Sequence, residues 1–135
     1  MRVLIADSDQ AFLEVAQRFL SRHGLEVQTA TNGLESVAMM RCDVPDVVVL
    51  QRELLWGGGD GVLDLMQQLS GWAKIPVILT TDGGVLEEPC PITCPQLVAQ
   101  LQKPYRLEDL LGRLQECKND SAPERLDILA LGTEP

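Results

Sequence analysis

Two segments of the chain are apolar on consecutive residues, and they restrict the possible folds more than any other feature of the sequence. They are "PDVVVL" (Pro45 to Leu50) and "IPVILTT" (Ile75 to Thr81). A strand that is apolar on successive residues is buried on both faces, as strands at the centre of a helix-covered parallel sheet are. Neighbouring parallel strands need long crossover connections, which are usually helices. We therefore expect an α/β fold.

The rest of the chain supplies the other elements of such a fold. "RVLIA" (Arg2 to Ala6) and "LVAQL" (Leu97 to Leu101) are short strand candidates, and "LEVQTA" (Leu25 to Ala30) alternates as a half-exposed edge strand does. Between the strands, residues recur at the spacing of a helix face. These residues are Phe12, Val15, Ala16, Phe19 and Leu20; Leu34, Val37, Ala38 and Arg41; Val62, Leu65, Met66 and Leu69; and Leu107, Leu110, Leu111 and Leu114. Alternating strands and helices predict a single parallel sheet with helices on both faces.

Short polar residues precede three of the predicted helices. We expect Asp7 or Ser8 to cap the first helix, Asn32 the second and Asp60 the third, because side-chain oxygens of these types accept from free backbone N–H groups.

The fourth helix position is occupied by a proline-rich segment, "DGGVLEEPCPITCP" (82–95). Its three prolines limit it to about one helical turn. Cys90 and Cys94 lie in this segment, and two interpretations stay open: half of a zinc site or a disulfide, or reduced thiols. The missing second pair of ligands favours thiols. We expect one domain over residues 1–118 and a C-terminal tail over residues 119–135.

Polar residues follow four of the predicted strands. Because ligands of such sheets bind at the carboxyl ends of the strands, these residues are the candidates for a site. They are Asp7, Ser8 and Asp9 after the first strand, Gln51 after the third, Thr81 after the fourth and Lys103 after the fifth.

Four motifs follow one another along the chain: "VLIADSD", "PDVVVLQREL", "PVILTT" and "QKPYRLEDLL". In this order and spacing they resemble a response-regulator receiver domain, and the resemblance covers residues 2–118. The resemblance implies a flavodoxin-like doubly wound sheet of five parallel strands in the order 2-1-3-4-5. It also implies a role in a two-component phosphorelay, with a histidine kinase or a downstream effector as partner. The start "MRVLIADSD" lacks the long apolar core of a signal peptide, so we expect a cytoplasmic protein.

In receiver domains, two acidic residues after the first strand and a backbone carbonyl hold Mg²⁺, and an aspartate ending the third strand accepts a phosphoryl group. A hydroxyl and a lysine contact the phosphoryl oxygens. By resemblance, Asp7, Ser8 and the backbone carbonyl of Glu53 take the Mg²⁺-binding positions. Gln51 takes the position of the phosphoryl acceptor, and Thr81 and Lys103 take the positions that contact the phosphoryl oxygens. A Lys–Pro bond after the fifth strand is commonly cis in this family.

Two of these side chains depart from the pattern, and the departures have chemical consequences. Gln51 carries an amide, which is not the carboxylate nucleophile that acyl phosphate formation needs. Mg²⁺ prefers carboxylate and water ligands, so with Gln51 and Ser8 we expect its binding at Asp7 to be weak or absent, with Asp9 as a possible assistant. Lys103 then needs a partner, for which Asp7 and the amide oxygen of Gln51 are the candidates. We predict a permanent Lys103–Asp7 contact.

Two aromatic residues stand near the predicted site. Trp56 lies within a loop, "LLWGGGDG", that is about two residues longer than is usual in receivers, and it either packs over the site or is presented to a partner. Tyr105 packs either on the surface that carries the signalling output in receivers or in the core.

The leading hypothesis is a receiver-like interaction module that works without phosphorylation and is not an enzyme. The net charge of −9 disfavours nucleic acid as a partner, and no apolar run is long enough to span a membrane. Two alternatives stay open: a receiver phosphorylated on another carboxylate, such as Glu53 or Asp9, and a flavodoxin-like cofactor binder. The acidic turn "DSDQ" argues against the latter, because a bound phosphate needs hydroxyls and free amides.

Overall fold

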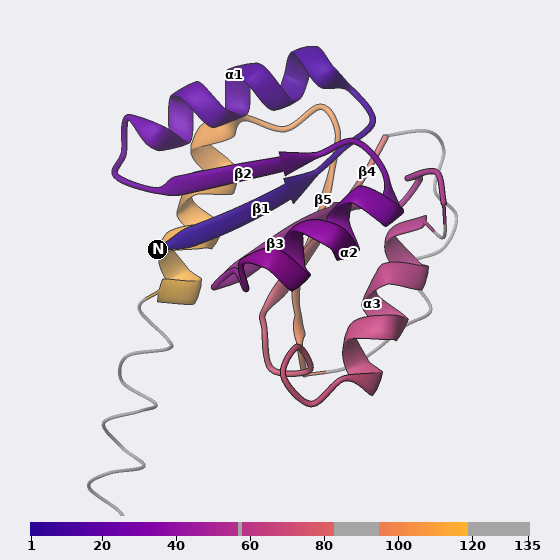
Figure 1. The fold of residues 1–135 in the computed structure, drawn as a ribbon. Coiled ribbons are helices and arrows are strands. Elements are labelled where there is room, and N and C mark those ends of the chain that lie inside the picture. The colour runs from indigo at the N-terminus through magenta and orange to yellow at the C-terminus, as the bar shows by residue number, and fades with distance from the viewer. Residues whose placement is uncertain (57, 83–94, 119–135) are drawn as a thin grey trace, which may run out of the picture. The chain divides into compact units, whose positions relative to one another are not determined.

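The computed structural model describes residues 1–56, 58–82 and 95–118. Its centre is a sheet of five parallel strands in the order β2-β1-β3-β4-β5 (Figure 1). The strands are β1 (Arg2–Ala6), β2 (Glu26–Ala30), β3 (Val47–Gln51), β4 (Val77–Thr81) and β5 (Leu97–Gln102). The predicted fold class and strand order are confirmed.

Three labelled helices connect the strands: α1 (Gln10–Ser21), α2 (Gly33–Cys42) and α3 (Gly58–Gln68). The chain moves from β1 outward to β2 and then back across β1 to β3. Because crossovers of this kind are right-handed, the reversal puts α1 on one face of the sheet and α2 and α3 on the other. The sheet therefore has helices on both faces, as predicted.

The chain divides into two compact units, residues 1–105 and residues 106–135. In the second unit, residues 107–118 form a helix in which Leu110 and Leu114 are buried. The sheet and the candidate site lie entirely in the first unit.

The burial of the strands follows their composition. Every residue of β3 and nearly every residue of β1 and β4 is buried, whereas β2 and β5 contain exposed positions. Since β2 and β5 are the edges of the sheet, each needs an apolar face only where a neighbour covers it. The continuous apolar runs thus identified the central strands.

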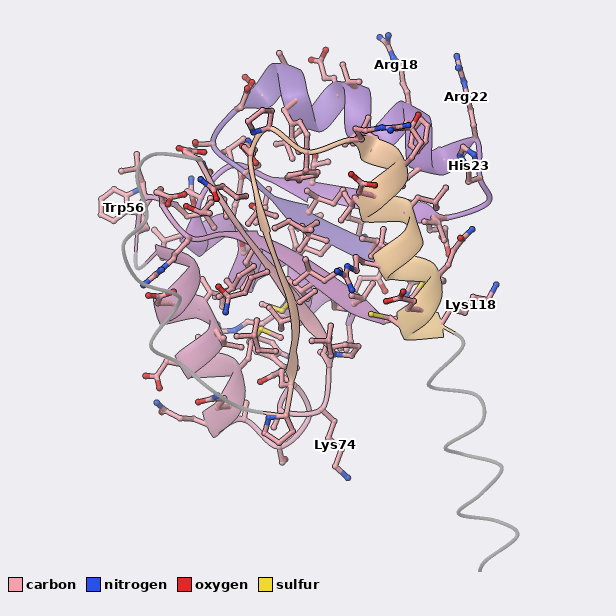
Figure 2. The ribbon with its side chains drawn as sticks, turned by 180° about the vertical axis from the view of Figure 1, so that it is seen from behind. Arg18, Arg22, His23, Trp56, Lys74 and Lys118 are labelled. Carbon is pink, nitrogen blue, oxygen red and sulfur yellow. The ribbon has the colours of Figure 1, made fainter. Side chains whose placement is uncertain are left out.

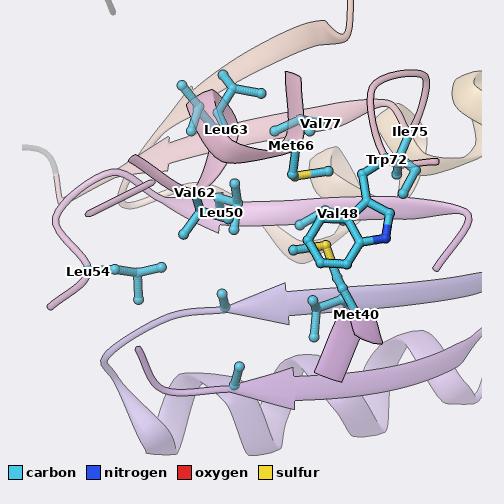
Figure 3. Packing of buried hydrophobic residues seen from close by; sticks show 14 residues of the cluster. Met40, Val48, Leu50, Leu54, Val62, Leu63, Met66, Trp72, Ile75 and Val77 are labelled. Carbon is cyan, nitrogen blue, oxygen red and sulfur yellow. The ribbon is translucent and has the colours of Figure 1, made fainter. Parts of the chain in front are cut away.

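One face of the sheet forms the hydrophobic cluster shown in Figure 3. Met40 of α2 and Leu63 and Met66 of α3 pack with Val48 and Leu50 of β3, and all five side chains are fully buried. Burying a side chain of this size contributes about 1.5–3 kcal/mol. This packing fixes α2, α3 and β3 against one another and so fixes the loops at the carboxyl ends of the strands.

Two of the predicted helix starts are wrong. Asp9, not Asp7 or Ser8, caps α1, and its Oδ1 accepts from the Phe12 amide at 3.1 Å. Asp7 is unavailable as a cap because its carboxylate contacts Lys103. The third helix begins at Gly58, so Asp60 lies inside its first turn. The predicted cap at Asn32 is confirmed, with its Oδ1 accepting from Glu35 N at 2.8 Å.

The predicted buried face of the second helix is also largely wrong. Gly33, Ser36 and Met40 are buried, whereas Leu34 is 63% exposed; Val37 packs partly against the core. The buried position 33 is a glycine because the loop after β3 lies directly against the start of α2, where Gly33 N donates to Leu55 O at 2.9 Å.

The proline-rich segment 83–94, with Cys90 and Cys94, and the tail 119–135 lie outside the described residues. Predictions on the fourth helix, on these cysteines and on the tail therefore stay predictions. In the parts of the chain that are described, no helix is long and apolar enough to cross a membrane.

Candidate functional site

The candidate site lies where the carboxyl ends of the strands come together. Gln51 ends β3 and pairs in register with Thr80, and Thr81 ends β4 beside Gln102 of β5. Asp7 directly follows β1, which is the other neighbour of β3. Four strands thus bring the predicted polar residues together at the carboxyl-terminal end of the sheet.

The first contact of the site is an ion pair between Asp7 and Lys103. Lys103 Nζ lies 2.7 Å from Asp7 Oδ2, and the two side chains are 18% and 2% exposed. The other oxygen, Oδ1, accepts from the Asp9 amide at 2.8 Å. Lys103 Nζ also lies 4.4 Å from the centre of the Phe12 ring, a favourable cation–π distance. The predicted pair is present, and the Lys103–Pro104 bond is cis, as the resemblance implies.

Gln51 is 1% exposed and uses both ends of its amide. Its Oε1 accepts from the Ser8 backbone N–H at 2.7 Å, and its Nε2 donates to Asp82 Oδ1 at 2.6 Å. The amide oxygen is therefore engaged by Ser8 N, and Lys103 forms its ion pair with Asp7. The side chain of Ser8 is exposed and takes no part in this contact. The amide links the ends of β1 and β4 through β3.

Glu53 supplies a second carboxylate at the same end of the sheet. Thr81 Oγ1 donates to Glu53 Oε2 at 2.6 Å, and the Asp82 backbone N–H donates to Glu53 Oε1 at 3.1 Å. The sequence points to Glu53 for its backbone carbonyl and as an alternative phosphorylated carboxylate, not as a hydrogen-bond acceptor, and it gives no role to Asp82. Thr80 is 2% exposed, so the hydroxyl among these polar groups belongs to Thr81, as strand alternation predicts.

Tyr105 lies beside the ion pair. Its ring meets Phe12 edge-on, with centroids 5.9 Å apart, and its buried hydroxyl has no hydrogen-bond partner among the described residues. Burial, with a smaller effect of the Asp7 charge, raises the pKa of Tyr105 well above its ordinary value. Of the two predicted positions for Tyr105, the structure thus favours the more buried one.

Trp56 does not cover the site. Its side chain is 66% exposed and projects away from the sheet (Figure 2), next to Leu55, which is 70% exposed. This is the second of the two positions that the sequence left open.

The residues at this edge do not fit the magnesium site of a receiver. Asp7, the remaining acidic ligand, has one oxygen on an ammonium group and the other on a backbone N–H. At the other two positions stand the amide of Gln51 and the exposed hydroxyl of Ser8. Mg²⁺ is bound in proteins through one or two carboxylates and water in near-octahedral geometry, and both oxygens of the remaining carboxylate, Asp7, already have partners. Within the described residues, no group of three or more His, Cys, Asp or Glu side chains is placed to hold a metal.

The polar side chains of the site take their partners from within the chain. Asp7 binds Lys103, Gln51 joins Ser8 to Asp82, and Glu53 joins Thr81 to Asp82. Chemically, the arrangement can hold the strand ends together, but it offers no carboxylate at position 51.

Comparison with known proteins places this geometry in a family. The family model "Response regulator receiver domain" matches residues 3–115. Response regulator MprA of Mycobacterium avium is 31% identical over 124 residues, which cover 92% of this chain and 54% of that protein. MprA of Mycobacterium tuberculosis is 31% identical over 125 residues, with 92% and 53% covered. The chain thus spans about half the length of these curated relatives.

Solved structures have the same fold. A response regulator receiver domain protein from Clostridium thermocellum superposes with a TM-score of 0.78 at 22% identity, covering 90% of this chain and 96% of that one. NtrX from Brucella abortus gives a TM-score of 0.80 at 20% identity, covering 92% and 28%. On the match of residues 3–115 and the relatives at 31% identity, the chain belongs to the response-regulator receiver domain family.

Proposed function

We propose that this chain is a receiver module of two-component signalling that acts through protein contacts and is not switched by phosphorylation of a carboxylate, because position 51 holds no acceptor aspartate. The observation that carries the proposal is the side chain of Gln51, which is buried and hydrogen-bonded at both ends where receivers place the acceptor aspartate. On this proposal the chain is not an enzyme.

The chemistry of the amide supports the proposal. Phosphoryl transfer to a receiver needs an oxygen nucleophile that is anionic at neutral pH. The amide oxygen of Gln51 carries no charge, and its nitrogen lone pair is delocalised into the carbonyl group. Moreover, both atoms are already held, Oε1 by Ser8 N and Nε2 by Asp82.

The groups that would contact a phosphoryl group also have other partners. By resemblance, Thr81 and Lys103 bind the phosphoryl oxygens. Here the Thr81 hydroxyl donates to Glu53 and the Lys103 ammonium pairs with Asp7. A phosphoryl group would have to displace two carboxylates of the chain itself, without the Mg²⁺ that normally offsets its charge. We infer weak or absent Mg²⁺ binding for the same reason.

The partners we propose are proteins, namely a histidine kinase or a downstream effector of a two-component system. A net charge of −9 would repel a nucleic acid backbone. Because the chain covers about half of its curated relatives, this proposal concerns the receiver module alone.

Intact-protein mass spectrometry after incubation with acetyl phosphate and Mg²⁺ tests the proposal. We expect no phosphoryl adduct on the wild type. A double variant, Gln51→Asp with Ser8→Asp, restores the acceptor and the second acidic ligand, and we expect it to gain an adduct that hydroxylamine removes. The proposal would be overturned by a hydroxylamine-labile adduct on the wild type, which peptide mapping would assign to Glu53, Asp9 or another carboxylate.

A further inference from the structure

Three exposed apolar side chains lie on two adjacent segments, outside the network described above. Leu34 is 63% exposed, Leu55 70% and Trp56 66%. The segments are in contact, because Gly33 N, next to Leu34, donates to Leu55 O at 2.9 Å. We call Leu34, Leu55 and Trp56 the Trp56 patch. Figure 2 shows the Trp56 indole pointing away from the protein. Exposed apolar clusters of this kind mark interaction sites in soluble proteins.

The backbone beneath the patch is fixed on both sides. Leu54, which precedes it, is 4% exposed and belongs to the hydrophobic cluster. A Cβ atom at Gly33 would lie 2.0 Å from Trp56 O, so only a glycine permits this approach of the loop to α2. A side chain on a fixed backbone loses little conformational entropy on binding, which favours its use as an anchor.

Trp56 also has an uncommon backbone conformation. Its φ of +62° lies in the left-handed region, where a bulky side chain is strained. Glycines, which adopt this region without strain, follow at positions 57–59. Local strain of this kind clusters at functional sites, and here it coincides with an outward-facing indole. Tryptophan is among the residues most enriched at the energetic centres of interfaces.

The charges around the patch determine what it can bind. Glu35 adjoins Leu34, and Glu53 lies two residues before Leu55; both are exposed. Asp82, also exposed, donates its amide to Glu53. Arg52 is the basic residue next to Glu53, and its charge is offset by Asp60, whose Oδ2 lies 3.3 Å from Arg52 Nε. The apolar centre therefore has an acidic border.

This border disfavours two occupants from the chain itself. In a symmetric dimer the same patch meets itself, so the carboxylates of two copies would face one another. The tail over residues 119–135 contains four acidic residues and one basic residue, so it is repelled as well. These residues are Asp120, Glu124, Asp127, Glu134 and Arg125.

We propose that the Trp56 patch docks a protein partner whose contact surface has an apolar stripe bordered by Lys or Arg side chains, as a basic amphipathic helix has. Trp56 and Leu55 pack on the stripe, and the acidic border pairs with the basic side chains. This docking proposal rests on the proposed function because it specifies the chemistry of the protein partner proposed there. It does not depend on whether the chain is phosphorylated.

The direct test is a binding titration with a defined probe, a synthetic amphipathic helical peptide of leucine and lysine. Trp72, the other tryptophan, is 8% exposed, so a blue shift of tryptophan emission reports on Trp56. We expect the peptide to cause this shift and to bind more weakly as salt is raised. A matched peptide with glutamate in place of lysine is expected to cause no shift.

Variants locate the binding site by isothermal titration calorimetry. We expect Trp56→Ser to weaken binding about tenfold or more and Leu34→Ser to weaken it by a smaller factor. Val15→Ser, a matched change at a 54% exposed residue of α1, is expected to leave the affinity unchanged. Circular dichroism verifies that each variant is folded.

Three outcomes would overturn the proposal: equal effects of Trp56→Ser and Val15→Ser, equal binding of the glutamate peptide, or a dimer in sedimentation that Trp56→Ser abolishes. The last outcome would identify a second copy as the occupant. None of them produces a phosphoryl adduct, so failure of this proposal is distinguishable from failure of the proposed function.

Discussion

Gln51 Nε2 donates to Asp82 Oδ1 at 2.6 Å, and a carboxylate at position 51 could not make this bond. An aspartate has only acceptors when it is ionised, whereas an amide has two donors. The substitution that removes the nucleophile thus also supplies the donor that ties β3 to the residue after β4. The hydrogen bond is specific to the amide.

The first prediction tests this bond by an isosteric change. Gln51→Glu replaces the donor by an acceptor beside Asp82, so we expect a loss of roughly 1–2 kcal/mol in the free energy of unfolding at neutral pH. Urea denaturation measures the loss. Adding Asp82→Asn returns a donor to the pair and should recover most of it; full additivity of the two changes would show that the residues are not coupled.

Lys103→Ala tests the ion pair. It leaves the buried carboxylate of Asp7 without its cation, and we expect a loss of about 3 kcal/mol, the lower end for breaking a buried pair, because Lys103 retains some solvent contact. The control is Lys74→Ala, at an exposed lysine, which should change stability by less than about 0.5 kcal/mol. Equal melting temperatures of Lys103→Ala and the wild type would contradict a structural role.

Glu53→Ala removes the acceptor of the Thr81 hydroxyl and of the Asp82 amide. Because Glu53 is exposed, we expect little change in global stability but faster hydrogen exchange at the Asp82 amide. Glu14→Ala, at an exposed position of α1, is the control. Unchanged exchange at Asp82 would mean that Glu53 does not hold the end of β4.

Tyr105→Phe removes a buried hydroxyl that lacks a partner among the described residues, so we expect a gain of about 1 kcal/mol. The folded chain raises the pKa of Tyr105 above the ordinary value of 10.0. The unfolded chain therefore ionises first, and the wild type loses stability as the pH rises above about 10. Chemical denaturation between pH 8 and 11 should show a shallower alkaline decline for Tyr105→Phe. Parallel curves would contradict the raised pKa.

Gly33→Ala tests the close approach of the loop to α2. The added Cβ would meet Trp56 O, a backbone atom, so we expect a loss of about 2 kcal/mol. Gly61→Ala is the matched change in α3, where no atom lies within 4 Å of the added Cβ. There we expect a gain of about 0.5–1 kcal/mol. A neutral Gly33→Ala would mean that the loop shifts freely.

The sequence predicted the sheet well because its signals are local. Consecutive apolar residues at 47–50 and 77–79 can be buried on both faces only at the centre of the sheet, and right-handed crossovers leave few orders of strands. The buried face of the second helix was harder to predict. One of the buried positions of this helix is Gly33, which a loop distant in the sequence approaches closely, and a periodic pattern of large apolar residues does not reveal this.

Only part of the site was predicted, because some of its contacts also join residues that are distant in the sequence. The Asp7–Lys103 pair follows from charge, since a partly buried ammonium needs a partner. Asp82 and the hydrogen bonds of the Glu53 side chain were missed because the receiver pattern gives these two side chains no hydrogen-bonding role. A physical signal was present: the buried amide of Gln51 must donate as well as accept, and the carboxylate directly after Thr81 is an available acceptor.

The most direct measurement of the central claim is a titration of the isotopically labelled wild type with beryllofluoride and Mg²⁺, followed by NMR. The signals to follow are the Gln51 side-chain amide and the backbone amides of Ser8 and Asp82. We predict that all three stay unchanged at saturating beryllofluoride, whereas the backbone amides of positions 8 and 82 shift in the Gln51→Asp, Ser8→Asp double variant. Saturable shifts of the wild-type signals would show that the pocket accepts a phosphoryl analogue and would contradict the account.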